Sequence, residues 1–355
     1  MGALEEIESA GAAHLAGMIV RAPNGESIRG EFAAGHGFRG FRDRGLAVRR
    51  TVLDDILLRR ARTAGARVEE GVRVTDLTRG PAGFVTGVRT LARAGGAHSL
   101  RSRMVIGADG LRSVVGRRLG LVRTSWWPRR IGLIAHYRGV RGMTDLGEMH
   151  VDRTGYFGLA DVGHGVTNIG LVVPITRAAE VAEGLPEFVE QWIADRPHLA
   201  ERFEDAERVS AVRATGPFAS AAKRAYAPGA ALVGDSAEFF DPFTGEGIYA
   251  ALRGGEILAP FVAEAVRLGS DGDTRSLRAY EVARRKEFSG KWKVERLVGM
   301  AVAFPPLMNH AARVLSRRKD MADLLVGVAG DFVPAAAVLS PRFLFTLFLS
   351  PAFRI

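Results

Sequence analysis

The spacing of apolar residues changes several times along this 355-residue chain, and each change predicts a different kind of element. Spacing of three and four residues, typical of helices, occurs in 3–14, 51–64, 177–207 and most of the chain after 246. Alternating apolar and polar residues, typical of strands, occur near 66–77, 83–91, 98–108 and 209–216. Between 17 and 50, short strand-like pieces alternate with glycine turns. Helices and strands are mixed along the chain, which predicts an α/β (α+β) fold.

The longest strand-like region lies between residues 130 and 175. It contains four consecutive apolar pieces, which are IGLIAHYRGV, GEMHVDRTG, YFGLADVG and GVTNIGLVVP. Turns containing glycine separate the pieces, and connections this short join antiparallel strands. We therefore expect an antiparallel sheet in this region.

Composition narrows the class of protein without identifying an activity. Apolar residues make up 47% of the chain and charged residues 25%, which is typical of globular proteins. The chain has no cysteine, which excludes disulfides and thiolate metal sites, and we expect no metal. The net charge of +10 either attracts anionic cofactors, acidic substrates or a membrane, or is spread over solvated helix faces. Because no basic stripe carries interleaved aromatic residues, we expect no nucleic-acid partner.

The segment from 230 to 260 carries the strongest candidate chemistry. An apolar run ends in Gly234-Asp235, a loop with Pro242, Gly245 and Gly247 follows, and a helical pattern begins near Ile248. Loop glycines let backbone N–H groups approach a ligand, and the helix dipole favours negative charge there. Asp235 can accept hydrogen bonds from ligand hydroxyls. The pattern predicts a site for a phosphate or an electron-accepting ring.

Two earlier segments add related features. Residues 104–110 read MVIGADG, an apolar strand that ends in Asp109-Gly110, after which Arg112 and Ser113 open a helix. Residues 48–68 read VRRTVLDDILLRRARTAGARV, a helical pattern with Arg50 near its start.

Together, and in this order, the three segments resemble the FAD-dependent oxidoreductases related to para-hydroxybenzoate hydroxylase and geranylgeranyl reductase. The Thr-Gly-Glu-Gly wording is closer to the geranylgeranyl reductase branch, and the resemblance covers most of residues 1–290. It implies FAD as the cofactor and NADH or NADPH as the electron donor. The cofactor-binding residues that it implies are Arg50, Asp109, Gly110, Asp235, Pro242, Gly245, Glu246 and Gly247.

The resemblance also implies roles and a domain organisation. Asp235 would hold the ribityl chain, Arg50 would lie along the flavin, and Asp109 would support the flavin and the donor side. An FAD/NAD(P)-binding Rossmann-like domain would comprise residues 1–125 and 216–290. An antiparallel-sheet substrate domain (126–215) would be interleaved with it, and apolar helices would follow (291–355).

One element of the family is missing from the sequence. The family begins with a strand, a G-x-G-x-x-G turn and a helix that bind the FAD pyrophosphate. This sequence instead opens on GALEEIESAGAAHL, which resembles a later region of the family. Residues 35–40 match G-x-G-x-x-G literally, but without a flanking buried strand or helix we interpret them as a loop. The missing element is explained by a wrong start, by a truncation or by a degenerate homologue without activity of its own. We expect this polypeptide alone to retain FAD weakly or not at all.

Candidate substrate residues lie on the expected sheet, at His136, Glu148, His150 and Tyr156. Glu148 and His150 are two apart and share one face of a strand. They either orient a substrate and relay a proton or form a solvent-facing pair. The stretch from Gly155 resembles the Tyr-x-Trp-x-Phe-Pro box of geranylgeranyl reductases. Tyr156 matches, while Gly158, Ala160 and Asp161 replace Trp, Phe and Pro. We assign no catalytic residue, because a flavin itself carries the redox step.

The C-terminal residues 332–353 are strongly apolar, but prolines and Arg342 interrupt them. No uninterrupted run reaches the ~20 residues of a membrane span. We expect either helices packed over a substrate cavity or a peripheral membrane contact. No signal peptide is visible, so we expect a cytoplasmic protein, membrane-associated if that contact forms. The expected function is FAD-dependent hydroxylation or double-bond reduction of a hydrophobic polyketide, aromatic or isoprenoid substrate.

Overall fold

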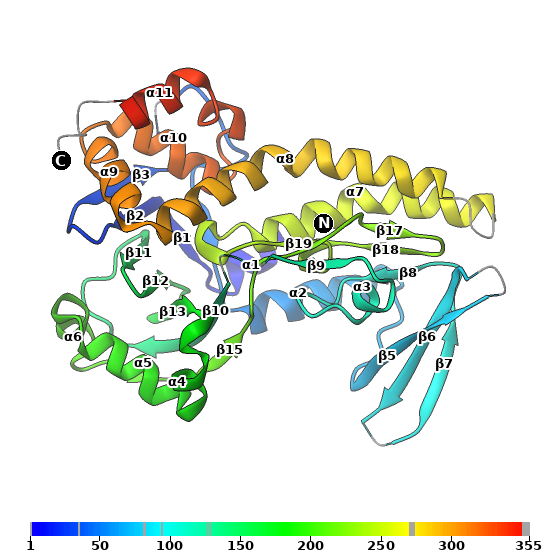
Figure 1. The fold of residues 1–355 in the computed structure, drawn as a ribbon. Helices are drawn as coiled ribbons and strands as arrows, with labels where there is room; N and C mark the ends of the chain where they lie inside the picture. Colours follow the sequence, from blue (N-terminus) through cyan, green and yellow to red (C-terminus); the bar gives the residue numbers. More distant parts are fainter. Residues whose placement is uncertain are drawn as a thin grey trace. The chain divides into compact units, whose positions relative to one another are not determined.

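The computed structural model describes residues 2–34, 36–80, 83–93, 95–125, 127, 129–269 and 274–349. Helices and strands follow one another in mixed order (Figure 1), which confirms the α/β fold class. Contacts divide the chain into two compact units. Unit 1 comprises 1–67, 128–217 and 296–355, and unit 2 comprises 68–127 and 218–295.

Unit 1 is built on an eight-stranded sheet, with the order β14-β10-β13-β12-β11-β2-β3 and with β15 also paired to β10. The strands are β2 (Gly17–Arg21), β3 (Ser27–Glu31), β10 (Arg130–Arg138), β11 (Leu146–Asp152), β12 (Gly155–Asp161), β13 (Val166–Pro174), β14 (Glu207–Arg208) and β15 (Arg213–Thr215). Strands β10, β13, β12 and β11 pair antiparallel, as the sequence predicted, and β2 joins β11 in parallel.

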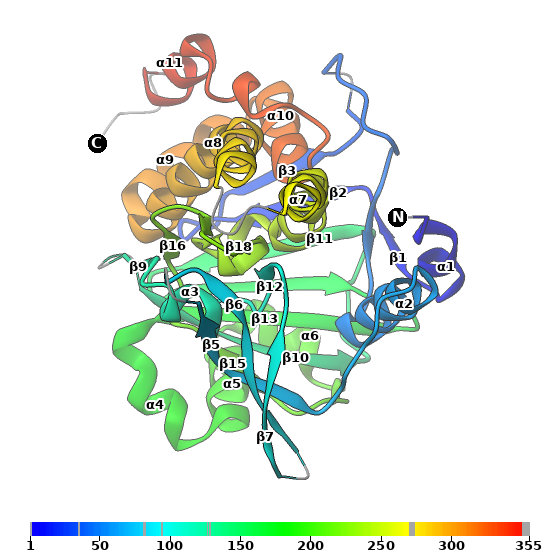
Figure 2. The same ribbon diagram turned by 90° about the vertical axis from the view of Figure 1, so that its right-hand side faces the viewer.

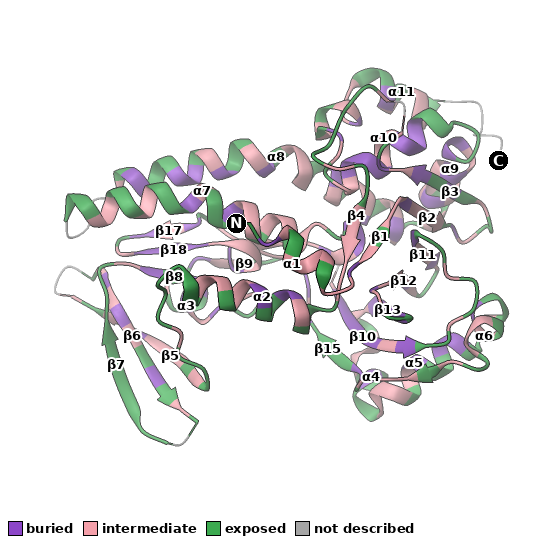
Figure 3. Cartoon of the chain, turned by 180° about the vertical axis from the view of Figure 1, so that it is seen from behind, coloured by how far each residue is buried: buried purple, intermediate pink, exposed green. Residues whose placement is uncertain are grey.

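One face of this sheet forms the core of unit 1. Leu133, Phe157 and Leu171 belong to a buried cluster with side chains from three helices. These helices are α4 (Ala178–Glu183), α5 (Leu185–Ala194) and α6 (Pro197–Phe203) (Figure 2). Helix α5 buries one stripe, including Trp192, and exposes the other (Figure 3). Because strand side chains alternate, the residues between these core positions project from the opposite face.

The remaining helices of unit 1 are α1 (Leu4–Ser9), α2 (Arg50–Thr63), α9 (Pro305–Leu315), α10 (Lys319–Ala329) and α11 (Pro341–Leu349), and strands β1 (Ala13–Leu15) and β4 (Gly45–Ala47) pair antiparallel. The helix predicted over 3–14 is therefore too long. It stops before Gly11, which has φ +80° and lies so close to His164 that a Cβ would be 2.3 Å from its Nε2.

Unit 2 contains three small sheets and the longest helices. The sheets are β5-β6-β7 (Val72–Arg79, Val85–Ala92, Ala97–Arg101), β17-β18-β8 (Tyr226–Ala227, Ala230–Leu232, Val105–Gly107) and β19-β16-β9 (Glu238–Phe239, Ser220–Ala222, Val122–Thr124). The helices are α3 (Val114–Arg118), α7 (Gly247–Leu268) and most of α8 (Arg275–Ala303). The single strand expected over 98–108 is two strands, β7 and β8, which belong to different sheets.

The division into units differs from the expected domains at the N-terminal end. We expected 1–125 to form one segment, whereas the contacts break at residue 67. Residues 17–31 extend the large sheet through β2 and β3, and α1 packs on α2. In the G-x-G-x-x-G match, Gly35 lies outside the described residues, and residues 36–44 contain no helix or strand.

Candidate functional site

The two strand-end motifs of unit 2 lie at the same edge of one sheet. Strands β8 and β18 are parallel neighbours, with Val105 opposite Ala230 and Gly107 opposite Leu232. Both strands therefore end at the same edge, where the chain continues into residues 109–110 and 234–235. In open α/β sheets, ligands bind at this carboxyl edge.

Ser236 links the two motifs directly. The N–H of Gly110 donates to Ser236 Oγ at 2.8 Å, and Ser236 Oγ donates to Asp109 Oδ1 at 3.2 Å. Val114 is the first residue of α3, and its N–H donates to the other carboxylate oxygen of Asp109 at 2.6 Å. Asp109 thus positions a turn and a helix end. Ser236 was not among the predicted site residues, and its position directly after Asp235 was the only signal for it.

The loop after β19 provides exposed backbone next to the start of α7. Gly245 has φ +76°, and a Cβ built on it would meet nothing within 4 Å; the same holds for Gly110, with φ +74°. After Glu246, the 22-residue helix α7 begins at Gly247. A Cβ on Gly247 would lie 3.8 Å from Asp235 Oδ1. The carboxylate of Asp235 therefore lies beside the first turn of a long helix.

These residues could hold the ribityl chain and ring of FAD. Open glycines allow a planar group to approach the backbone, Asp235 offers an acceptor for hydroxyls, and the α7 N-terminus favours negative charge. Pro242 begins the single turn of 3-10 helix that precedes Gly245.

Glu295, an acidic residue that the sequence did not single out, forms a hydrogen bond with the backbone of this loop. The backbone N–H of Asp241 donates to Glu295 Oε1 on α8 at 3.0 Å. Burial, together with the nearby carboxyl groups of Glu246, Asp241 and Glu238, raises the pKa of Glu295 to about 8. Lys291, one helical turn earlier, lies 3.7 Å from Glu246. Only the folded chain brings Glu295 to the loop, because it lies about fifty residues further along the sequence.

Arg50, the remaining predicted cofactor residue, belongs to unit 1, while the other seven belong to unit 2. It is the first residue of α2, and its Nε lies 2.9 Å from Asp54 Oδ1. This is an ion pair within one helix, and the Arg50 side chain is 67% exposed.

The four predicted substrate residues lie on two different faces of the large sheet. Glu148 and His150 are opposite Leu159 and Phe157 of the buried core, so they face the helices. Tyr156 lies on the other face of its strand, and so does His136 on β10, because their sequence neighbours belong to the core. The four residues therefore do not share one face of the sheet.

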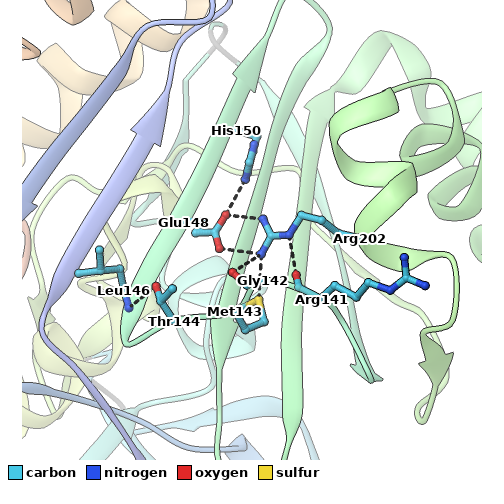
Figure 4. Close-up of polar contacts among 8 residues, drawn as sticks. All are labelled: Arg141, Gly142, Met143, Thr144, Leu146, Glu148, His150 and Arg202. Carbon is cyan, nitrogen blue, oxygen red and sulfur yellow. Dashed lines mark hydrogen bonds and ion pairs between the residues drawn. The ribbon is translucent and has the colours of Figure 1, made fainter.

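Glu148 and His150 form a buried network with a third residue (Figure 4). Arg202 of α6 donates to both carboxylate oxygens of Glu148, at 2.6 and 2.8 Å, and His150 Nε2 lies 3.0 Å from the same group. The Glu148 side chain is only 11% exposed, so the pair is not solvent-facing. Burial alone would raise the pKa of Glu148, but the hydrogen bonds from His150 and Arg202 outweigh it and lower the pKa to about 2. Nothing in the sequence indicated Arg202, which is 54 residues away.

The opposite face of the sheet carries small residues and an exposed apolar side chain. Gly170 is flanked by Ile134 and Gly158 on the neighbouring strands, and a Cβ on Gly170 would meet nothing within 4 Å. Ile134 is 43% exposed although it lies within the sheet. His136 lies nearby, opposite Asn168, and burial, with the charge of Arg49, lowers the pKa of His136. Around Ile134 and Gly170, this face offers an open apolar floor next to His136, whereas Tyr156 on the same face is buried.

Among the described residues, every helix is too short or too polar to span a membrane. Nor do the described side chains include a group of three or more histidine, aspartate or glutamate residues that could hold a metal ion.

Comparison with known sequences identifies relatives of the chain. The family described as FAD binding domain matches residues 42–291. The chain is 30% identical over 328 residues to digeranylgeranylglycerophospholipid reductase 2 of Methanopyrus kandleri, covering 90% of this chain and 77% of that protein. It is 34% identical over 256 residues to digeranylgeranylglycerophospholipid reductase of Methanothrix thermoacetophila, covering 70% of this chain but only 61% of that protein.

Solved structures share the fold. A geranylgeranyl bacteriochlorophyll reductase-like protein from Thermoplasma acidophilum gives a TM-score of 0.76 at 20% identity, covering 98% of this chain and 86% of that one. A triple mutant of a flavin-dependent brominase gives 0.77 at 21% identity, covering 96% and 84%. The family match over most of the chain, the sequence relatives and the strand-end motifs agree, and the chain belongs to the FAD-binding oxidoreductase family, in its geranylgeranyl reductase-like branch.

Proposed function

We propose that this protein is an FAD-dependent reductase that uses NADH or NADPH to reduce double bonds in a hydrophobic, isoprenoid-type substrate. One observation carries the proposal: residues 109–110 and 234–235 meet at the carboxyl edge of two parallel strands, beside the N-terminus of α7. The relatives support the substrate class, since their names are those of reductases of digeranylgeranylglycerophospholipids.

Bound FAD would supply the hydride chemistry, and the chain's own residues would position it and the substrate. Asp235 would accept hydrogen bonds from the ribityl hydroxyls. The first N–H groups of α7, from Gly247 onward, would stabilise negative charge. Ser236 and Asp109 would keep the facing turn in place through the bonds described above.

The open face of the large sheet would receive the substrate. Ile134 and Gly170 would contact an apolar chain, and His136, whose pKa is lowered, would be neutral at pH 7 and could accept a hydrogen bond. Two positions of the prenyl-reductase box, Gly158 and Ala160, lack their aromatic rings here. We propose that the loss of these rings suits a substrate of different shape.

A second candidate is oxygen-dependent hydroxylation of a polyketide or aromatic substrate. The same two departures from the reductase box, at Gly158 and Ala160, favour it. Under this alternative, the same FAD and nicotinamide chemistry would serve an oxygenase.

The test is to purify the 355-residue chain, add FAD and record the visible spectrum after desalting. Retained flavin bands, followed by NADH or NADPH oxidation on adding digeranylgeranylglycerophospholipid without O2, would support the reductase. Oxidation that requires O2 and yields a hydroxylated product would support the oxygenase. A colourless protein that FAD does not change would overturn both and leave a homologue without activity of its own.

We also propose a peripheral membrane contact through the C-terminal segment. Helix α11 buries Phe343 but exposes Phe345 at 66% and Leu349 at 65%. Residues 350–353 of the predicted segment lie outside the described residues. Vesicle flotation tests this contact, and replacing Phe345 and Leu349 with serine should abolish flotation.

A further inference from the structure

A separate pocket lies at one edge of the large sheet, wholly within unit 1. Its cavity of about 230 Å³ is lined by the β2–β3 turn, the end of β11 and the start of α6. The lining residues include Arg21, Gly25, His150, Arg196 and His198. The volume is smaller than that of sites for drug-sized ligands, so the pocket suits a small group.

The acids around this pocket are already neutralised. Asp152 accepts from Arg196 Nε at 2.7 Å, and the Arg196 guanidinium also stacks on Trp192, 3.5 Å from the ring centroid. Glu148, behind His150, is held by Arg202 in the network of Figure 4. Arg21, by contrast, forms no ion pair with any acid in the described part of the chain. The pocket therefore has uncompensated positive charge.

Two stacked imidazoles form one wall. The rings of His150 and His198 have centroids 5.3 Å apart and planes 27° apart. Because Glu148 is ionised and can only accept, His150 Nε2 must carry the hydrogen of their 3.0 Å bond. His150 Nδ1 is buried without a hydrogen-bond partner among the described residues.

The side chains around His198 are also positively charged. Burial first, and then the positive charges of His150, Arg21, Arg196 and Arg202, lower the pKa of His198. An anion bound among these groups would raise the pKa of His198, because it would offset the neighbouring positive charges. Its binding should therefore be coupled to proton uptake by His198.

We propose that this pocket binds the phosphate of a small phosphomonoester, with Arg21 and His198 donating to its oxygens. A phosphomonoester has a second pKa near 6, so near neutral pH it is mostly a dianion with three acceptor oxygens, which suits the uncompensated positive charge of the pocket. A carboxylate carries a single negative charge and only two acceptor oxygens. The same chemistry is available from a soluble metabolite or from the monoester headgroup of a lipid.

The test follows the histidine side chains of the full chain by NMR during titration with sn-glycerol 3-phosphate. We expect saturable shifts of the His198 and His150 resonances and a raised pKa of His198. Acetate, which carries a single negative charge, should bind on the order of tenfold more weakly. Vesicles containing phosphatidic acid form the second arm: binding that glycerol 3-phosphate displaces identifies a lipid source, and no binding identifies a soluble one.

Variants complete the design. Arg21→Met should weaken glycerol 3-phosphate binding on the order of tenfold. Arg29→Met is the matched control, because Arg29 is an exposed residue of the same hairpin that does not line the pocket. Equal losses in the two variants, equal binding of acetate and glycerol 3-phosphate, or no saturable shift would each overturn the proposal. If Arg21→Met does not fold, the comparison of anion affinities in the wild-type protein tests the proposal instead. No flavin enters this measurement, so its outcome is independent of the proposed redox function.

Discussion

Glu148 in unit 1 and Glu295 in unit 2 are both partly buried glutamates, yet their surroundings have opposite effects. Arg202 and His150 hold the pKa of Glu148 at about 2. Burial among Glu246, Asp241 and Glu238 raises the pKa of Glu295 to about 8. Glu148 is therefore a charged structural anchor between a strand and a helix. Glu295 carries a proton at neutral pH next to the candidate cofactor loop.

The difference shows that partners, and not burial alone, decide the state of an acid. A guanidinium that donates twice outweighs the cost of desolvating Glu148. Glu295 receives only one backbone N–H, from Asp241, while like charges surround it. The two residues should therefore affect stability in pH ranges that do not overlap.

Removing the partner of Glu148 should have the largest effect. Arg202→Met leaves a buried carboxylate without its guanidinium, and we expect the free energy of unfolding to fall by about 3 kcal/mol. Urea denaturation measures it. Arg141→Met is the control, because Arg141 is 49% exposed and its ion pairs with Glu204 and Asp205 lie at the surface, so its loss should change the unfolding free energy far less. Similar losses in both variants would contradict a special role for the buried network.

The second prediction concerns Glu295, whose effect on the free energy of unfolding appears only when stability is measured as a function of pH. Its folded pKa is raised, so the folded state binds a proton that the unfolded chain releases above about pH 4.5. Stability should therefore fall steadily as the pH rises from about 4.5 to about 8 and then level off.

Glu295→Gln keeps the acceptor for the Asp241 N–H and removes the titration. Its unfolding free energy, measured across this pH range, should lack the decline seen in the wild type. Glu264→Gln, an exposed residue of α7, makes the same charge change away from the loop and should keep the decline. Parallel curves for wild type and Glu295→Gln would show that the carboxyl group is not protonated at neutral pH.

A smaller effect should distinguish a specific role of the cofactor loop in FAD binding from a general loss of stability through backbone strain. Gly245→Val introduces a branched side chain at φ +76° and fills the open space above the loop. We expect FAD binding, followed by quenching of flavin fluorescence, to weaken about tenfold. Gly65→Val creates the same kind of strain at φ +95°, also in open space, but at the end of α2. It should destabilise the fold without changing FAD affinity, and a loss of affinity in both variants would place the loop outside the site.

The smallest effect concerns the open face of the large sheet. Gly170→Leu meets no neighbour within 4 Å of its Cβ and replaces a glycine within a strand, so the thermal midpoint should stay the same or rise slightly. The leucine would cover the floor next to Ile134, and we expect kcat/KM with digeranylgeranylglycerophospholipid to fall several-fold, by about 1 kcal/mol. Unchanged kinetics would move the substrate to another surface.

Local patterns were enough to predict the elements that short stretches of sequence encode. The alternating strands of 130–175, the helix opened by Ser113 and the start of α7 near Gly247 all appear close to their predicted positions. Glycines with φ near +75°, such as Gly110 and Gly245, mark turns that other residues would strain. The same local signals carried the family resemblance, because a cofactor loop is a continuous stretch of chain.

The sequence by itself therefore determined the fold class, the family and the strand-end motifs of the candidate FAD site. Only the tertiary structure showed that His150 and Tyr156 lie on opposite faces of the sheet and that residues 1–67 belong to unit 1. It also brought Arg202 close to Glu148, and Glu295 close to Asp241. The physical reason is that periodicity fixes which residues share a face but not which element covers it. The charge state of a glutamate depends on that covering element, through contacts between residues about fifty positions apart.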